Sequence, residues 1–185
     1  MSLRHAILGF LSLRPMSGYD LKKAFDESVG HFWTADQAQI YRALARLVDD
    51  GHVEVRTIEQ TGRPDRREHR ITEAGLRELD GWLTAAAEPR PMREPFLLKI
   101  FFAGRLAPHD LKAVLTRHVD TERRRLETLT GLADGLGRLL AGRDIDLPQR
   151  LRLATLDNGI RHTRTEIEWA DALLEQIDPP SRPDR

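Results

Sequence analysis

Cysteine is absent from all 185 residues of the chain, which excludes disulfide bonds, thiolate metal ligands and a cysteine nucleophile. Long apolar runs are missing as well, because no stretch approaches the roughly 20 residues that a membrane-spanning helix needs. The apolar N-terminal run is short and is soon followed by Arg14 and the pair Lys22–Lys23. We therefore expect a buried helix there and not a signal peptide, no contact with membranes, and a cytoplasmic protein.

A surplus of charge of either sign is also lacking, since 29 lysines and arginines balance 29 aspartates and glutamates. This balance counts against a nucleic-acid-binding protein, because phosphate contacts usually come with a basic domain. It favours, as an alternative, a module that binds another protein. Local clusters of charge must decide between these two classes.

Residues for catalysis or metal binding are not grouped along the sequence. The seven histidines are scattered, and no pair has the spacing of a helical metal site. No serine stands in a nucleophile-elbow context, and no glycine-rich loop could cradle a phosphate. We therefore expect no enzymatic activity, no cofactor and no metal.

Two prolines in Glu88–Pro91 disfavour helix and divide the chain into two parts. Residues 1–88 mix short helical patterns with a strand-like stretch, whereas residues 92–178 are almost entirely helical in pattern. The proline-rich residues 179–185 are expected to be a disordered tail.

The first part has the element order of a winged helix-turn-helix domain. Helix-start signals stand at Ser17 and Asp36, each followed three residues later by a side chain suited to the first turn. Two strand patterns, 52–59 and 66–71, flank a turn, and a further helix begins at Thr72. The predicted fold class is mainly α with a small β wing: a winged helix-turn-helix domain, then an α-helical dimerisation domain.

The helix that begins after Asp36 is the candidate DNA-recognition helix. Its rear carries one apolar stripe, which is what a helix in the major groove needs behind its polar front. The opposite face supplies amides, a phenol and guanidiniums: Gln37, Gln39, Tyr41, Arg42 and Arg46. An ordinary amphipathic helix with a solvated face remains the alternative, and Arg46 could pair with Asp49 or Asp50.

The turn between the two strands is rich in arginine. Arg63, Arg66 and Arg67 lie close together there, opposed by few acidic residues. Such a hairpin tip can lie along phosphates or enter the minor groove, so we predict DNA contacts for all three. The alternative is an exposed loop whose charges pair with one another.

The second part predicts two long helices that start near Pro108 and Pro148 and form an antiparallel hairpin. Their apolar seams, together with a block at Phe96–Phe102 that is dense enough to be buried on most sides, predict a homodimer. Trp82 and Trp169 fit packing better than effector binding.

Several motifs follow one another in the first part: Ile7-Leu8-Gly9-Phe10-Leu11, Ser17-Gly18-Tyr19-Asp20-Leu21, Gln39-Ile40-Tyr41-Arg42-Ala43-Leu44, Thr61-Gly62-Arg63-Pro64 and Ile71-Thr72-Glu73-Ala74-Gly75. In this order, over about residues 3–83, they resemble the PadR family of regulators. Phe96–Phe102 resembles the start of the longer version of that family's C-terminal domain. The resemblance implies a homodimeric repressor, often released by a small molecule. It assigns DNA contact to Gln39, Tyr41 and the wing arginines. Asp36 departs from the family, which often has serine there.

Together these patterns predict a sequence-specific transcription regulator that binds double-stranded DNA at a pseudo-palindromic operator. In the dimer, the two recognition helices should lie about one DNA turn apart, ~34 Å. The alternative is a winged-helix module that binds a protein and no specific DNA.

Overall fold

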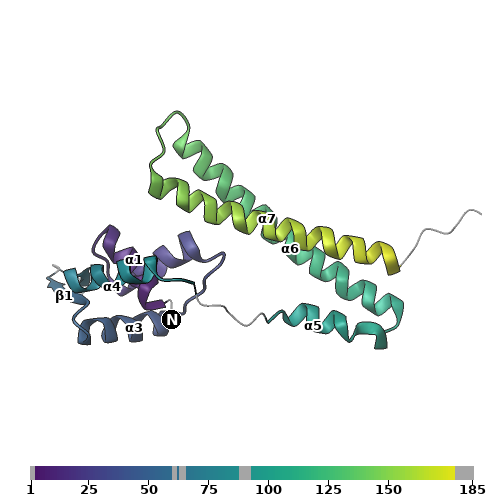
Figure 1. Cartoon of the computed structure of the whole chain (residues 1–185), viewed down its shortest axis with the longest axis horizontal. Coiled ribbons are helices and arrows are strands. Elements are labelled where there is room, and N and C mark those ends of the chain that lie inside the picture. The colour runs from purple at the N-terminus through teal and green to yellow at the C-terminus, as the bar shows by residue number, and fades with distance from the viewer. Residues whose placement is uncertain (1–2, 60–61, 63–65, 88–92, 178–185) are drawn as a thin grey trace, which may run out of the picture. The chain divides into compact units, whose positions relative to one another are not determined.

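The computed structural model of the chain describes residues 3–59, 62, 66–87 and 93–177. Within these ranges helices follow one another along the chain, interrupted by a single β-hairpin (Figure 1). The chain divides into two compact units, residues 1–90 and 91–185. The first unit contains α1 (Leu3–Leu13), α2 (Gly18–Ala24), a π-helical turn (Phe25–Val29), α3 (Gln37–Asp49), β1 (Val53–Ile58), β2 (Arg66–Ile71) and α4 (Glu73–Thr84). The second contains α5 (Pro95–Phe101), a 3-10 turn (Ala103–Arg105), α6 (Pro108–Leu140) and α7 (Leu147–Ile177).

Local capping signals set the starts of α2, α3 and α4, as predicted. Ser17 and Asp36 each form a reciprocal capping box, with Asp20 and Gln39 respectively. The hydroxyl of Thr72 accepts a hydrogen bond from an amide in the first turn of α4. These bonds satisfy amide donors that have no partner inside the helix, so each helix begins where its cap stands.

The apolar stripe behind α3 lies in the core of the first unit. Ile40, Leu44 and Leu47 are almost completely buried, and they pack with apolar side chains of α1 and α2. Removing such side chains from water is worth about 1.5–3 kcal/mol each. This burial fixes the rotation of α3 about its axis and leaves its polar side exposed.

The wing is held along both edges of β2. On one side β1 pairs with it in antiparallel register, from Val53 opposite Ile71 to Ile58 opposite Arg66. On the other side the Met16 amide donates to the His69 carbonyl at 3.1 Å, and the His69 amide donates to the Met16 carbonyl at 2.8 Å. The segment between α1 and α2 therefore anchors the wing, a link that the strand patterns do not reveal.

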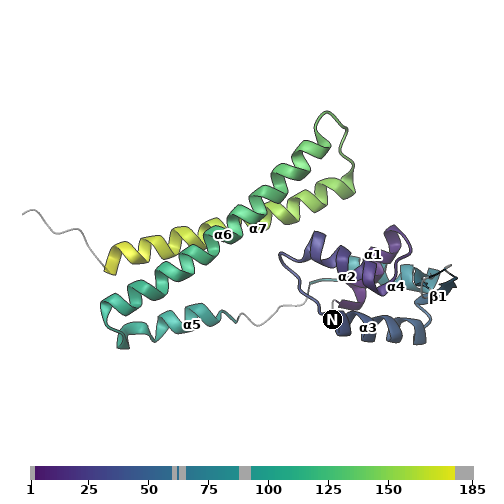
Figure 2. The ribbon, with the colours of Figure 1, turned by 180° about the vertical axis from the view of Figure 1, so that it is seen from behind.

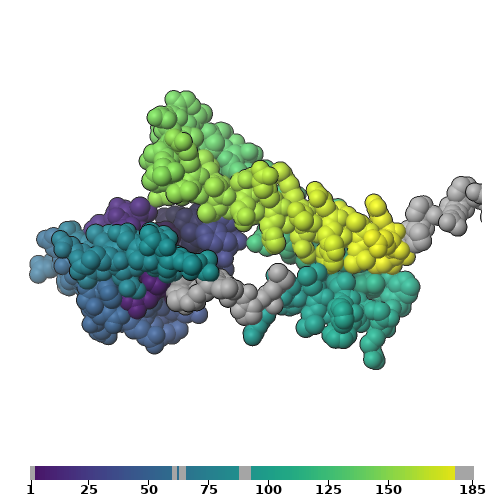
Figure 3. Space-filling model, in the orientation of Figure 1, coloured from purple at the N-terminus to yellow at the C-terminus, as the bar shows by residue number. Residues whose placement is uncertain are grey.

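In the second unit, α6 and α7 form the predicted antiparallel hairpin, and they lie against each other in both ribbon views (Figure 2). Leu115, Val119 and Leu129 of α6 are buried, as are Leu156 and Ala170 of α7. In the space-filling view α7 lies in front of the middle of α6, and the two helices pack without a visible gap (Figure 3). None of the helices in the described ranges is long and apolar enough to cross a membrane.

The predicted burial of Phe96–Phe102 is wrong for a single copy of the chain. Phe96 stacks on His118 of α6, with ring centroids 3.6 Å apart, and meets Trp169 of α7 edge-on. The opposite face of α5 and the residue after it stay open: Leu98, Phe101 and Phe102 are 61%, 81% and 62% exposed. Phe96 thus packs on both α6 and α7, whereas the face of α5 that carries Leu98 and Phe101 is left uncovered.

Three sequence predictions fall outside the described residues. They are the boundary around residues 88–92, the tail 179–185, and the wing tip with Arg63.

Candidate nucleic-acid interface

The polar residues predicted on α3 are all exposed, but they divide between two sides of the helix. At 100° per residue, Gln39, Arg42 and Arg46 project on one side, and Tyr41 projects on the other. A separate pocket lies beside each group. Gln37 lines neither pocket.

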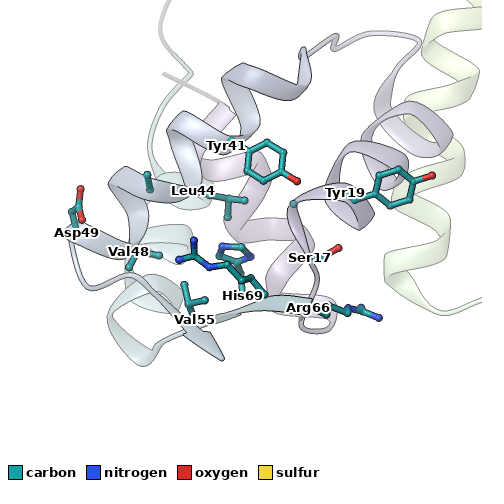
Figure 4. A pocket seen from close by; sticks show the side chains of 12 residues that line it. Ser17, Tyr19, Tyr41, Leu44, Val48, Asp49, Val55, Arg66 and His69 are labelled. Carbon is teal, nitrogen blue, oxygen red and sulfur yellow. The ribbon is translucent and has the colours of Figure 1, made fainter. Parts of the chain in front are cut away.

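The wing-side pocket lies between the first turn of α2, the Tyr41 side of α3, and β2, and has a volume of about 500 Å³ (Figure 4). Tyr41, Arg66 and Arg67, all predicted as DNA contacts, line it. The Tyr41 ring packs against Gly18, where an added Cβ would lie 2.6 Å from the ring. The close approach of α2 to α3 at this point therefore depends on glycine.

The α1-side pocket lies on the other side of α3, next to the N-terminal end of α1, and its volume is about 590 Å³. Gln39, Arg42 and Arg46 line it together with Arg4 and Trp33. The structure thus brings Gln39, Arg42 and Arg46 together on this side of α3, apart from Tyr41 and Gln37, and adds Arg4, which no sequence motif singles out.

Gln39 has two roles in this arrangement. Its side-chain oxygen accepts a hydrogen bond from the Asp36 amide at 3.3 Å, and the Asp36 carboxylate accepts one from the Gln39 amide at 2.7 Å. The side-chain nitrogen of Gln39 keeps two donors for a base edge or a phosphate. The Asp36 carboxylate therefore serves the helix terminus.

Arg66 holds the wing to α2. Its guanidinium donates to the Asp20 carboxylate at 2.8 Å and lies 3.8 Å from Glu68. Partial burial raises the pKa of Asp20, but hydrogen bonds from the hydroxyl and amide of Ser17 and the nearby positive charge of Arg66 outweigh it and lower the pKa. Asp20 therefore stays charged, and Arg66, which was predicted to contact DNA, forms an ion pair with it.

The other predicted arginines of the described wing and α3 remain available. No described carboxylate forms an ion pair with Arg42, Arg46 or Arg67. The ion pair considered between Arg46 and Asp50 is not formed; Asp50 instead lies 3.3 Å from the Arg4 guanidinium. Three guanidiniums thus keep their full charge around the exposed side of α3, although the chain is neutral overall.

His69 lies at the inner end of the wing-side pocket, between α3 and Val55 (Figure 4). The ring is buried, and its Nδ1 lies 3.3 Å from the Met16 carbonyl. Burial lowers the pKa of His69 below 6.5, its ordinary value, as does the nearby charge of Arg67, whereas the carbonyl contact raises it. The neutral imidazole is therefore the form that the folded wing accommodates.

The lowered pKa of His69 predicts that the wild-type chain loses stability in acid. Unfolded His69 takes up a proton as the pH falls below about 6.5, while the folded state resists protonation. The stabilising contribution is therefore complete above pH 6.5 and is lost progressively below it. Urea unfolding of wild type and His69→Gln from pH 8 to pH 5 should show a smaller acid loss in the variant. Equal losses would contradict the assignment.

The described residues contain no group of three or more histidines, aspartates or glutamates placed to hold a metal ion. Sequence reasoning missed the roles of Met16 and Arg4, and it placed Asp20 in the first turn of a helix without its pairing to Arg66. These contacts join partners at least 46 positions apart along the chain, so no local pattern marks them.

Comparisons with known proteins agree with this geometry. Residues 7–81 match the transcriptional regulator PadR-like family, and residues 92–178 match the family described as virulence activator alpha C-term. A probable transcriptional regulator of Mycobacterium tuberculosis is 32% identical over 96% of this chain and 98% of its own length. The negative transcriptional regulator PadR of Bacillus subtilis is 27% identical over 95% of this chain and 97% of its own.

Two solved structures of Bacillus subtilis PadR share the fold. The complex with operator DNA has a TM-score of 0.87 at 27% identity and covers 96% of this chain and 100% of that chain. The complex with p-coumaric acid has a TM-score of 0.79 at 26% identity and covers 95% of each chain. These likenesses confirm the predicted fold class and the resemblance found in the motifs. The chain belongs to the PadR-like family of transcriptional regulators.

Proposed function

We propose that the chain is a sequence-specific DNA-binding repressor that inserts α3 into the major groove of its operator. The observation that carries the proposal is the set of three exposed arginines, Arg42, Arg46 and Arg67, that no described carboxylate neutralises. Free guanidiniums can replace counterions on phosphates, which supplies a large share of the affinity of DNA-binding proteins. The likeness to a relative solved with operator DNA supports the same role.

The contacts divide by chemistry. Gln37, Gln39 and Tyr41 offer hydrogen bonds suited to base edges, and the arginines suit phosphates or guanine. On the wing, Arg67 is the phosphate contact among the described residues, and Arg63 remains a proposal from the sequence. Arg66 acts chiefly by holding the wing on α2 through Asp20.

We assign dimerisation to residues 92–178. The open face formed by Leu98, Phe101 and Phe102 is too apolar to favour exposure to water, and a second copy would cover it. A symmetric dimer reads a pseudo-palindromic operator, with recognition helices about one DNA turn apart, ~34 Å.

We also propose that a small molecule relieves repression. The support is a relative of the same fold that has been solved with p-coumaric acid. The protein would act in the cytoplasm as a regulator and not as an enzyme.

Binding to the DNA upstream of the chain's own gene, with unrelated DNA as competitor, tests the proposal. We expect the upstream fragment to resist an excess of competitor, because specific affinities typically exceed non-specific ones about 10³-fold or more. The alternative, a module that binds protein, is favoured by the zero net charge. It predicts no preference for either DNA and no retention on heparin.

A further inference from the structure

The α1-side pocket has the composition of an anion site. It is lined by eight residues, and none of these carries a carboxylate. Three of the eight are arginines: Arg4 from α1, and Arg42 and Arg46 from α3. The wing-side pocket differs, because Asp49 contributes to its lining.

The polar groups around the α1-side pocket include many hydrogen-bond donors. The guanidiniums of Arg42 and Arg46 have no described ion-pair partner, and the side-chain nitrogen of Gln39 is left free by the capping box. Thr34 adds a hydroxyl from the segment before α3. Guanidinium and amide donors of this kind match the oxygens of a phosphate.

Arg4 lines the pocket in a position held by contacts within the protein, and nearby carboxylates offset its charge. One of its terminal nitrogens lies 3.3 Å from the Asp50 carboxylate and 3.2 Å from Nδ1 of His52, and its Nε lies 3.9 Å from Glu78. These contacts hold the start of α1 beside the end of α3. The charge available to a ligand therefore comes from Arg42 and Arg46.

The position of the pocket indicates which anion it takes. An α-helix with its side chains is about 10–12 Å across and the major groove is about 12 Å wide, so both sides of an inserted helix lie near a phosphate backbone. The wing-side pocket would then face one strand, and the α1-side pocket would face the other. We propose that the α1-side pocket seats a backbone phosphate of the DNA strand opposite the wing. The inference rests on the proposed function and extends the interface to Thr34 and α1.

A charge placed at Thr34 tests the pocket without changing α3. Thr34 is exposed and lies outside the helices, so Thr34→Glu and Thr34→Gln should both fold. The two variants differ only in charge. We expect Thr34→Glu to bind upstream and unrelated DNA about tenfold more weakly than Thr34→Gln, because a carboxylate would repel the phosphate. Equal affinity of the two variants would overturn the proposal.

Arg46→Gln supplies a second readout, with Arg77→Gln as its matched control on the exposed side of α4. Arg46→Gln should lower the slope of log affinity against log salt by about one, equally on both DNAs, and Arg77→Gln should leave it unchanged. An unchanged slope for Arg46→Gln would contradict a phosphate contact. If the wild-type chain binds no DNA, the proposed function is wrong. If wild type binds DNA and Arg46→Gln keeps the same salt slope, only the phosphate site is wrong.

A free anion is the other source of the same chemistry. Inorganic phosphate at constant ionic strength should not displace DNA from wild type selectively. If it displaces DNA from wild type but not from Arg46→Gln, the pocket takes a free anion and the assignment to DNA is overturned.

Discussion

The Leu98→Glu, Phe101→Glu double variant is expected to sediment as a monomer and to bind its operator about 10²–10⁴ times more weakly than wild type. Both side chains point away from the contact of Phe96 with α6 and α7, and both are more than half exposed. In the dimer the two new carboxylates of each chain would be buried opposite those of the other chain, and burying unpaired charges of like sign would destabilise the dimer. A monomer binds only one half-site of the operator, so it loses the additional affinity that a dimer gains by binding both half-sites at once.

Folding must be separated from assembly in this experiment. Because the replaced side chains are exposed in the single chain, the double variant should keep its helical circular dichroism. Leu13→Glu, at a similarly exposed leucine of α1, is the matched control and should leave the oligomeric state unchanged. A double variant that remains a dimer at micromolar concentration would show that this face is not the interface.

The Arg42→Gln, Arg67→Gln double variant has the second-largest expected effect. The two residues stand on different elements, and neither has a described ion-pair partner, so each should lose its phosphate contact without disturbing the fold. Charged hydrogen bonds are worth about 1.5–3 kcal/mol each, which predicts a loss of at least a hundredfold for the pair. The salt slope should fall by about two.

A control with the same change of net charge isolates the interface in that experiment. Arg77→Gln combined with Arg161→Gln removes two exposed arginines from α4 and α7. Fluorescence anisotropy over a range of salt should give wild-type slopes for this control. If both double variants weaken binding equally, total charge and not the contact geometry would govern affinity.

Local patterns were enough to predict the four α-helices and two strands of the first unit, but not the π-helical turn Phe25–Val29. The capping boxes at Ser17 and Asp36 involve residues three positions apart, and the buried stripe of α3 repeats every helical turn. Such signals depend on neighbours in the chain, so they can be read directly from the sequence. The winged order then followed from the strands and the arginine-rich turn.

Long-range pairings could not be predicted in the same way. Arg66 binds Asp20 across 46 positions, and Arg4 contacts His52 across 48. No periodicity connects these partners. The sequence therefore assigned Arg66 to DNA with Arg67, whereas the fold places its guanidinium against α2.

The exposure of α5 has a different cause. Leu98, Phe101 and Phe102 are apolar as a core requires, but their burial depends on a surface that one copy of the chain does not supply. Apolar composition indicates that a residue tends to be covered, and it does not identify what covers it.

A salt titration of wild-type affinity, for the upstream DNA and for an unrelated fragment, would show whether the chain binds DNA and whether it does so specifically. We expect affinity to fall steeply with salt on both DNAs, with the upstream fragment bound more tightly throughout. Tight, competitor-resistant binding would also provide the operator for effector screening. Absence of binding to either DNA at low salt would rule out the proposed DNA-binding function and favour a module that binds another protein.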